Sequence, residues 1–320
     1  MSNKQKNKII AIIGPTAGGK TGLSVDLAYK YKGEIISADS RQVYKGMDVG
    51  TGKDLADYTI QAKDKNGKAK KIKIPYHLID VVSPKTNFSL AKYQKKGERA
   101  LKDILKRNKL PLIAGGTGLY AQALVEGYNL SKIKPDPELR KNLEKLTPRQ
   151  LYKKLVQLDK AGAQALNNSD RNNPRRLIRQ IERARLGKQP KEKNSTNKEE
   201  REFLVICLAP EKQELEKRIK KRLKERLEEE GMIKEVRNLH YEKGVSWRRL
   251  ESFGLEYKYI SFYLRDKISY PQMKNDLYTA ICQFANRQLT WFRRWERQGR
   301  TIYWVKSKAE ANKLAGNFLK

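Results

Sequence analysis

Residues 14–21 read Gly-Pro-Thr-Ala-Gly-Gly-Lys-Thr and match the phosphate-loop pattern G-x-x-x-x-G-K-[ST]. The run Ile9–Ile13 before the pattern is apolar and β-branched, which predicts a buried parallel strand, and Thr21–Lys30 after it has the content of a helix. A strand, a glycine-rich loop and a helix in this order point backbone N–H groups and a helix N-terminus at an anion. The pattern therefore predicts a polyphosphate site, and it does not distinguish ATP or another nucleotide from a different polyphosphate.

All eight residues of this loop are expected at the phosphates: Gly14, Pro15, Thr16, Ala17, Gly18, Gly19, Lys20 and Thr21. Lys20 has the length to reach a terminal phosphate, and the Thr21 hydroxyl is the expected protein ligand of Mg²⁺.

The first 120 residues alternate between strand-like and helix-like segments. The strand-like runs are Ile9–Ile13, Glu34–Ala38, His77–Val82 and Pro111–Ala114, and the helix-like ones are Thr21–Lys30 and Leu90–Arg107. This alternation predicts an α/β fold of the P-loop NTPase type, a parallel sheet with helices on both faces. Functional residues are then expected just past the strand ends, where Asp39 and the run 115–118 stand.

The rest of the chain predicts three regions: an α/β core over 1–128, a small all-helical insertion domain over 129–200, and a return to the core over 201–320. The insertion carries helical patterns at Leu139–Leu146, Pro148–Leu158 and Pro174–Leu186, followed by a polar linker at Gln189–Glu202. After it we expect a strand at Arg201–Leu208, a long helix at Glu211–Leu239 with Gly231 as a candidate break, a helix at Met273–Arg297 opened by Ser269 and Pro271, and a last strand at Thr301–Val305.

Charge is the second strong feature. The chain has 70 Lys and Arg against 36 Asp and Glu, a formal net charge of +34, which indicates a polyanionic partner such as nucleic acid. The alternative is a lysine-rich proteome in which many lysines only solubilise helices. Residues 61–73 hold six lysines around Asn66-Gly67, which predicts a hairpin that either touches a phosphate backbone or is a solvated loop.

Other features narrow the class of protein. Cys207 and Cys282 lack metal-ligand spacing and predict neither a zinc site nor a disulfide framework. Neither a secretion signal nor a membrane-spanning run is apparent, so we expect a cytoplasmic protein with no membrane partner. Arg218, Arg222 and Arg226 form a helical stripe that fits either phosphate contact or a solvated face paired with glutamates.

Several short motifs occur together in a fixed order. They are residues 37–44 (SADSRQVY), 47–53 (MDVGTGK), 77–80 (HLID), 115–120 (GGTGLY), 173–179 (NPRRLIR) and 284–292 (FANRQLTWF). With the phosphate loop, this set resembles the tRNA dimethylallyltransferases, also called tRNA isopentenyltransferases, over roughly residues 8 to 295. The resemblance is to the bacterial form, because the zinc finger of many eukaryotic members is not seen.

The resemblance implies a reaction and its substrates. A dimethylallyl group passes from dimethylallyl diphosphate to N6 of the adenosine immediately 3′ of the tRNA anticodon (position 37), and the loop at 14–21 grips diphosphate with Mg²⁺. We expect a monomer that binds the tRNA anticodon stem-loop.

The resemblance also implies roles for individual residues. Asp39 matches the general base of the family; its alternative roles are a helix cap or an outer ligand of Mg²⁺. Thr117 matches the threonine that lines the reaction channel; its alternative role is a hydroxyl that caps a turn. With Lys20 these form the expected catalytic set. Arg218 and Arg222 match arginines that face the diphosphate. The expected tRNA contacts are Asp39, Ser40, Arg41, Gln42, Thr117, Arg175, Arg176, Leu177, Ile178, Arg179, Arg287 and Gln288.

The chain departs from the family pattern at Gly18, where serine is usual, and at 251–257. Two rival interpretations remain at this point. A P-loop kinase or NTPase explains residues 14–21 equally well but explains the basic insertion poorly. A non-catalytic RNA-binding protein explains the charge but not the retention of Lys20, Thr21, Asp39 and Thr117.

Overall fold

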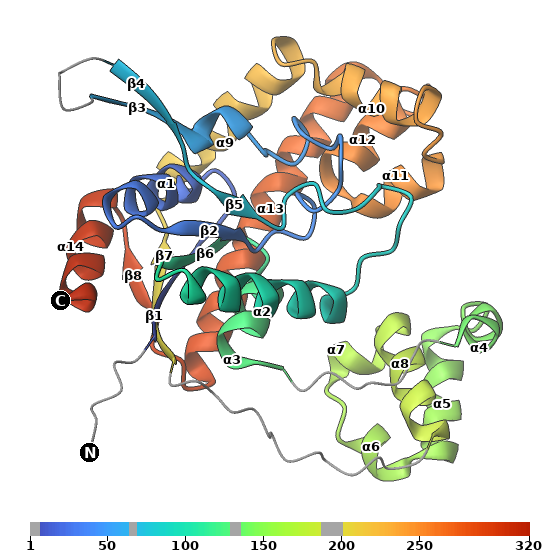
Figure 1. The fold of residues 1–320 in the computed structure, drawn as a ribbon. Helices are drawn as coiled ribbons and strands as arrows, with labels where there is room; N and C mark the ends of the chain where they lie inside the picture. Colours follow the sequence, from blue (N-terminus) through green and yellow to red (C-terminus); the bar gives the residue numbers. More distant parts are fainter. Residues whose placement is uncertain (1–6, 64–68, 129–135, 187–200) are drawn as a thin grey trace, which may run out of the picture. The chain divides into compact units, whose positions relative to one another are not determined.

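The computed structural model describes residues 7–63, 69–128, 136–186 and 201–320 (Figure 1). The chain forms two compact units. The larger unit comprises Met1–Tyr128 and Lys198–Lys320, and the smaller unit comprises Asn129–Asn197.

A six-stranded parallel sheet forms the centre of the larger unit. In spatial order its strands are β5 (Tyr76–His77), β2 (Glu34–Ser37), β6 (Pro111–Gly115), β1 (Asn7–Ile13), β7 (Arg201–Leu208) and β8 (Tyr303–Val305). Every neighbouring pair is parallel, and β1 aligns Ile13 with Gly115 of β6 and with Cys207 of β7. The predicted fold class is confirmed, and β7 resumes the sheet after the smaller unit as expected.

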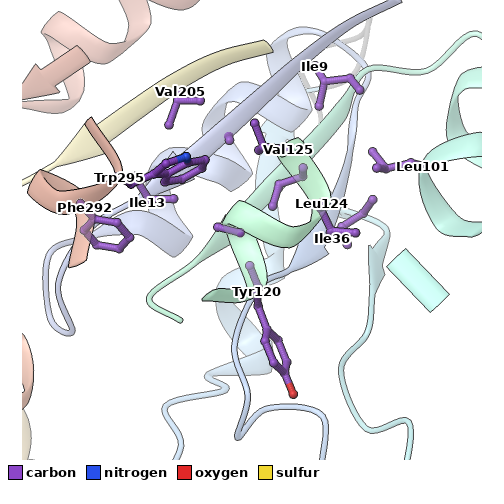
Figure 2. Close-up of a cluster of buried hydrophobic side chains, with 14 of the residues drawn as sticks. Ile9, Ile13, Ile36, Leu101, Tyr120, Leu124, Val125, Val205, Phe292 and Trp295 are labelled. Atoms are coloured by element: carbon purple, nitrogen blue, oxygen red, sulfur yellow. The ribbon is translucent and has the colours of Figure 1, made fainter. Parts of the chain in front are cut away.

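The two faces of β1 are buried under different helices. Ile9, Ala11 and Ile13 face a cluster that includes residues of α2 (Leu90–Lys106), α3 (Gly118–Glu126) and the end of α13 (Tyr270–Arg297), as Figure 2 shows. Ile10 and Ile12 face a second cluster with α1 (Lys20–Lys30) and α14 (Lys308–Leu319). Burial of both faces explains why this strand reads as a continuous apolar run rather than an alternating one.

Helices after β7 build a further core around α13. They are α9 (Lys212–Glu228), α10 (Met232–Tyr241), α11 (Trp247–Phe253) and α12 (Leu255–Tyr263), and their apolar faces meet in one cluster. Gly231 has φ 77° and separates α9 from α10, which confirms the predicted break. α13 begins three residues earlier than predicted, because the Ser269 side chain accepts the Gln272 N–H and caps the helix at that point.

The strand predicted at His77–Val82 is wrong beyond its first residue. Leu78 and Asp80 have φ values of 64° and 55°, which an extended strand does not allow. Instead, the Asp80 and Val81 amides donate to the carbonyls of Gln42 and Val43, so this segment runs beside residues 42–43.

The lysine-rich hairpin is confirmed as an antiparallel pair, β3 (Thr59–Lys63) and β4 (Ala69–Lys73), which follows the short 3₁₀ helix η1 (Leu55–Tyr58). The expected turn at Asn66-Gly67 lies outside the described residues, as does most of the expected linker at 189–202, whose last two residues begin β7.

The smaller unit is all helical. It contains α4 (Pro137–Leu143), α5 (Pro148–Leu158), α6 (Lys160–Gln164), α7 (Asn168–Arg171) and α8 (Pro174–Arg185) around a small apolar core. Side chains of Asp136, Thr147 and Asn173 cap the starts of α4, α5 and α8. The short helices α6 and α7 were not predicted, because four or five residues carry too little periodicity to be recognised.

Both cysteines are free, Cys207 buried and Cys282 half-buried. Within the described ranges, no helix is long and apolar enough to cross a bilayer.

Candidate active site

A cavity of about 450 Å³ opens in the larger unit at the carboxyl ends of β1, β2 and β6. This is the edge of a parallel sheet at which ligand sites form. Its wall includes Thr16, Ala17, Lys20 and Thr21 of the phosphate loop, Asp39–Gln42 after β2, Gly115–Thr117 after β6, Arg222 and Arg226 of α9, and Arg287 and Gln288 of α13.

The phosphate loop takes a shape that only glycine permits at one point. A Cβ on Gly14 would lie 2.3 Å from the carbonyl oxygen of Leu208, at a φ of 150°. Gly19, with φ 90°, is the N-cap of α1. The loop therefore passes close to the end of β7 and delivers Lys20 and Thr21 to the cavity at the start of a helix.

Lys20 is a half-buried cation in the wall of this cavity. Its ammonium donates to the carbonyl oxygen of Pro15 at 2.6 Å. Burial lowers the pKa of Lys20 to about 8, against a weaker raising effect of Asp39. A partly desolvated ammonium with one neutral acceptor is a site suited to an anion.

Two arginines of α9 complete the cationic side. Arg222 donates to the Thr16 hydroxyl at 2.5 Å, and burial, then the neighbouring Arg226, lowers the pKa of Arg222 to about 10. Arg226 is buried and pairs with Asp54 at 3.0 Å. Arg218 is half exposed, pairs with Glu214 at 2.7 Å and is not part of the cavity wall.

Asp39 and Thr117, 78 residues apart in sequence, meet through the segment after β2. Asp39 Oδ1 accepts the backbone N–H groups of Arg41 at 2.8 Å and Gln42 at 3.4 Å. Thr117 Oγ1 accepts the Ser40 N–H at 3.0 Å and donates to Ser40 Oγ at 3.3 Å. Asp39 thus caps its own turn with one carboxylate oxygen, and among the described residues no hydrogen bond engages the other.

Two glutamine side chains that were expected to contact tRNA form hydrogen bonds within the protein. Gln42 accepts the Ser37 hydroxyl at 3.0 Å and donates to the Gly52 carbonyl at 3.1 Å. Gln288 is buried, accepts the Thr16 N–H and donates to the Gly116 carbonyl, both at 2.8 Å. Gln288 therefore links the phosphate loop to the turn after β6, whereas Arg287 is exposed at the cavity with its guanidinium over the Phe284 ring.

The residues of the smaller unit that were expected to contact tRNA lie on different faces of α8, some exposed and some buried. Arg175 and Arg176 of α8 are exposed, and Arg176 pairs with Asp170. Arg179 pairs with the buried Glu182 at 2.9 Å. Leu177 and Ile178, which were also expected to contact tRNA, are buried in the core of this unit, and their contact with tRNA stays a prediction.

Sequence reasoning missed part of the cavity wall. Phe253, Glu256 and Tyr257 line it, within the segment that departs from the family pattern. Burial raises the pKa of Glu256, and the opposing effects of Arg226 and Arg222 are smaller. Gly50–Gly52 also line it. The run 47–53 was visible as a motif, but its place in the wall has no local sequence signal.

Thr21 offers a hydroxyl oxygen to Mg²⁺ at the cavity. The Thr21 side chain lines the cavity, and its hydroxyl makes no hydrogen bond to another described residue. Across the described ranges, no group of three acidic, His or Cys side chains forms a metal site. This fits Mg²⁺ held by Thr21 together with substrate phosphates, since Mg²⁺ commonly binds with few protein ligands and keeps several waters.

The fold and the site define a phosphate-loop α/β protein in which the loop, Asp39 and two arginines of α9 line one cavity. The family model described as IPP transferase matches residues 42–295, and the one described as isopentenyl transferase matches residues 7–63. The chain is 42% identical to tRNA dimethylallyltransferase 1 of Syntrophus aciditrophicus over 312 residues (97% of this chain, 98% of that protein). It is 42% identical to tRNA dimethylallyltransferase 2 of Shewanella sediminis over 302 residues (94% of each).

Solved structures agree. The crystal structure of the tRNA isopentenylpyrophosphate transferase of Bacillus halodurans matches with a TM-score of 0.66 and 33% identity, over 98% of this chain and 97% of that one. A eukaryotic dimethylallyltransferase shares the fold, with a TM-score of 0.74 at 24% identity, over 98% of this chain and 77% of that one. The chain belongs to the IPP transferase family, and the resemblance found in the sequence is confirmed.

Proposed function

We propose that this protein transfers the dimethylallyl group of dimethylallyl diphosphate to N6 of the adenosine immediately 3′ of the anticodon in tRNA. The products are N6-isopentenyladenosine and diphosphate. Transfer of a dimethylallyl group to an adenosine in tRNA is the activity of the relatives at about 40% identity. The donor, the acceptor atom and the residue roles are proposed from the site.

One observation carries the proposal. A cavity of about 450 Å³ has the phosphate loop with Lys20 and Arg222 in its wall together with Asp39. Such a cavity suits a reaction whose leaving group is a diphosphate and whose acceptor must lose a proton. A kinase also needs a phosphate loop with cations, but it transfers the phosphoryl group itself and uses a carboxylate to bind the metal ion. The segment that follows β6 is rich in glycine and contains no acidic residue that could serve as this carboxylate.

The proposed step forms one bond and breaks another. The N6 lone pair attacks C1 of the dimethylallyl group, the C1–O bond breaks, and its electron pair leaves on the diphosphate. Asp39 takes the proton from N6, as a positioned carboxylate does in general base catalysis. No covalent bond to the protein forms.

Cationic side chains in the cavity wall stabilise the negative charge that develops on the leaving diphosphate. Lys20, Arg222 and Arg226 lie in a partly enclosed wall, where electrostatic stabilisation of a developing anion is stronger than in water. Thr21 would hold Mg²⁺, which when bound supplies further neutralisation of this charge. Ile281 and Phe284 of α13 add an apolar wall to the same cavity, which suits the hydrocarbon part of the donor.

The tRNA is proposed to contact the exposed arginines of the smaller unit, Arg175 and Arg176, and the exposed Arg287 at the cavity. The net charge of +34 supports binding to an RNA backbone. The target adenosine must leave its stack to reach a cavity of this kind. We further propose a monomer acting in the cytoplasm, where its tRNA substrate is found; size-exclusion chromatography with light scattering tests the monomer.

The test is a transfer assay with radiolabelled dimethylallyl diphosphate, Mg²⁺ and an unmodified tRNA anticodon stem-loop. A matched RNA carries guanosine in place of the target adenosine. Label in the first RNA and none in the second is the expected result. Absence of label in both, alongside an active relative as positive control, refutes the proposal; a parallel arm with labelled ATP then tests the kinase alternative.

A further inference from the structure

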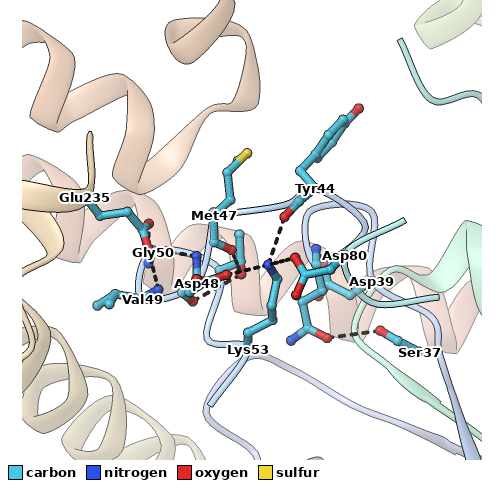
Figure 3. Close-up of polar contacts among 12 residues, drawn as sticks. Ser37, Asp39, Tyr44, Met47, Asp48, Val49, Gly50, Lys53, Asp80 and Glu235 are labelled. Atoms are coloured by element: carbon cyan, nitrogen blue, oxygen red, sulfur yellow. Dashed lines mark hydrogen bonds and ion pairs between the residues drawn. The ribbon is translucent and has the colours of Figure 1, made fainter. Parts of the chain in front are cut away.

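Lys53 is a fully buried cation with no role in the proposed chemistry. Its ammonium donates to the carbonyl oxygen of Tyr44 at 2.8 Å, to Asp48 Oδ1 at 2.5 Å and to Asp80 Oδ1, as Figure 3 shows. These three acceptors use all three N–H donors of an ammonium group. The hydrogen-bonding capacity of the Lys53 ammonium is therefore filled by protein groups, and the ammonium has no donor left for a ligand.

The three acceptors belong to three different segments. Tyr44 ends the segment 39–44 that begins with Asp39. Asp48 belongs to the 47–53 loop, by which we mean residues 47–53. Asp80 belongs to the segment after β5, where its own N–H donates to the carbonyl of Gln42 at 3.1 Å. Lys53 thus connects the segment 39–44, which carries Asp39, to the 47–53 loop and to the segment after β5.

The 47–53 loop is also part of the cavity wall, through Gly50, Thr51 and Gly52. A Cβ on Gly52 would lie 2.6 Å from Nη2 of Arg226, so the guanidinium packs directly on the loop backbone. The Gly52 carbonyl accepts from Gln42, the residue whose N–H binds Asp39 Oδ1. A shift of this loop would therefore move both Arg226 and the turn of Asp39.

Glu235 of α10 holds the same loop from its other side. Its carboxylate accepts three consecutive backbone N–H groups, those of Asp48 and Val49 at 2.7 Å and of Gly50 at 3.1 Å. The Tyr257 hydroxyl, in the cavity wall, donates to it at 2.7 Å. Figure 3 shows Glu235 and Lys53 on opposite sides of the loop.

We propose that Lys53 and Glu235 are positioning residues for prenyl transfer: they fix the 47–53 loop, and through it the placement of Asp39 and Arg226. The inference rests on the proposed function. A loop with two glycines loses much conformational freedom on folding and needs specific contacts to hold one shape. A buried ion pair is weak as a source of stability, but it fixes geometry where it forms. A misplacement of 1 Å in a catalytic group lowers turnover by about 100-fold.

The experiment measures kcat and KM for both substrates in Lys53→Met and Glu235→Gln, beside urea unfolding of each variant. We expect Lys53→Met to lose about 100-fold in kcat and Glu235→Gln about tenfold, with each KM within about threefold of wild type. Arg107→Met is the matched control. It removes one partner of the buried Glu34, whose other partner is His77, and Glu34 lies at the start of β2, the end of that strand remote from Asp39. It should keep kcat within about twofold even where stability falls.

A triple variant separates positioning from charge balance. Adding Asp48→Asn and Asp80→Asn to Lys53→Met removes the uncompensated carboxylates, and we expect recovered stability without recovered kcat. Recovery of kcat would overturn the inference, as would unchanged kcat in Lys53→Met and Glu235→Gln. If Lys53→Met does not fold, the isosteric Glu235→Gln decides. An inactive wild type refutes the proposed function and this inference with it, whereas an active wild type with unaffected variants refutes the inference alone.

Discussion

Lys20→Met is expected to stabilise the ligand-free protein at neutral pH while abolishing prenyl transfer. Burial lowers the pKa of Lys20 to about 8, from the ordinary lysine value of about 10.5. The native state therefore holds the charged form less favourably than the unfolded chain does. A partly desolvated cation that serves to bind an anion is a site where function opposes stability.

The magnitude follows from the size of the shift. A lowering of about 2.5 pKa units, at about 1.4 kcal/mol per unit, corresponds to roughly 3 to 4 kcal/mol of destabilisation. It is fully present below pH 8 and disappears as pH rises to 10.5, because in that window the unfolded chain binds a proton that the native state does not. Between pH 7 and pH 9 the free energy of unfolding of wild type should gain about 1 kcal/mol relative to Lys20→Met.

The assay is urea unfolding of both proteins at pH 7 and pH 9, with the difference between the proteins as the measured quantity. Titration of the other lysines cancels in that difference. Lys20→Ala serves as a second variant that lacks the methionine's packing. A difference between wild type and both variants that does not change with pH would refute the argument from burial. Normal label transfer by Lys20→Met would refute the role of Lys20 at the diphosphate.

Further predictions concern the base, the turn beside it and the RNA. Asp39→Asn should lower the single-turnover transfer rate by about 100-fold or more while leaving tRNA affinity in filter binding unchanged, since general base catalysis contributes about 10²–10⁴; a rate near wild type would exclude Asp39 as the base. Thr117→Val removes the acceptor of the Ser40 N–H and should destabilise the protein by about 1–3 kcal/mol in urea unfolding, whereas Thr117→Ser should be close to neutral. Binding of tRNA should weaken by about 10³-fold or more between 50 and 200 mM salt, and Arg175→Ala should reduce the slope of log K against log salt by about 1; an unchanged slope would remove Arg175 from the RNA contacts.

Local patterns were sufficient for much of the fold. The strand, loop and helix around residues 14–21 have the predicted order, because each is specified by neighbours in sequence: an apolar run, glycines at strained backbone positions, and a helix start at Lys20. The break at Gly231 and the start of α13 near Ser269 follow from single residues with a known local conformation. The strand expected at His77–Val82 failed, because an apolar run specifies burial and not the backbone path that achieves it.

The sequence by itself predicted a phosphate site and determined which family the chain resembles. Only the tertiary structure decided how the site is held. Gln288 contacts the phosphate loop from 272 positions away, and Glu235 binds the backbone of Asp48 from 187 positions away. Such contacts depend on where helices pack against the sheet, and periodicity within one segment carries no information about the partner across the fold. Lys53 makes the same point. The sequence showed it only as the last residue of the motif at 47–53, and the meeting of three segments makes it a buried cross-link beside the cavity.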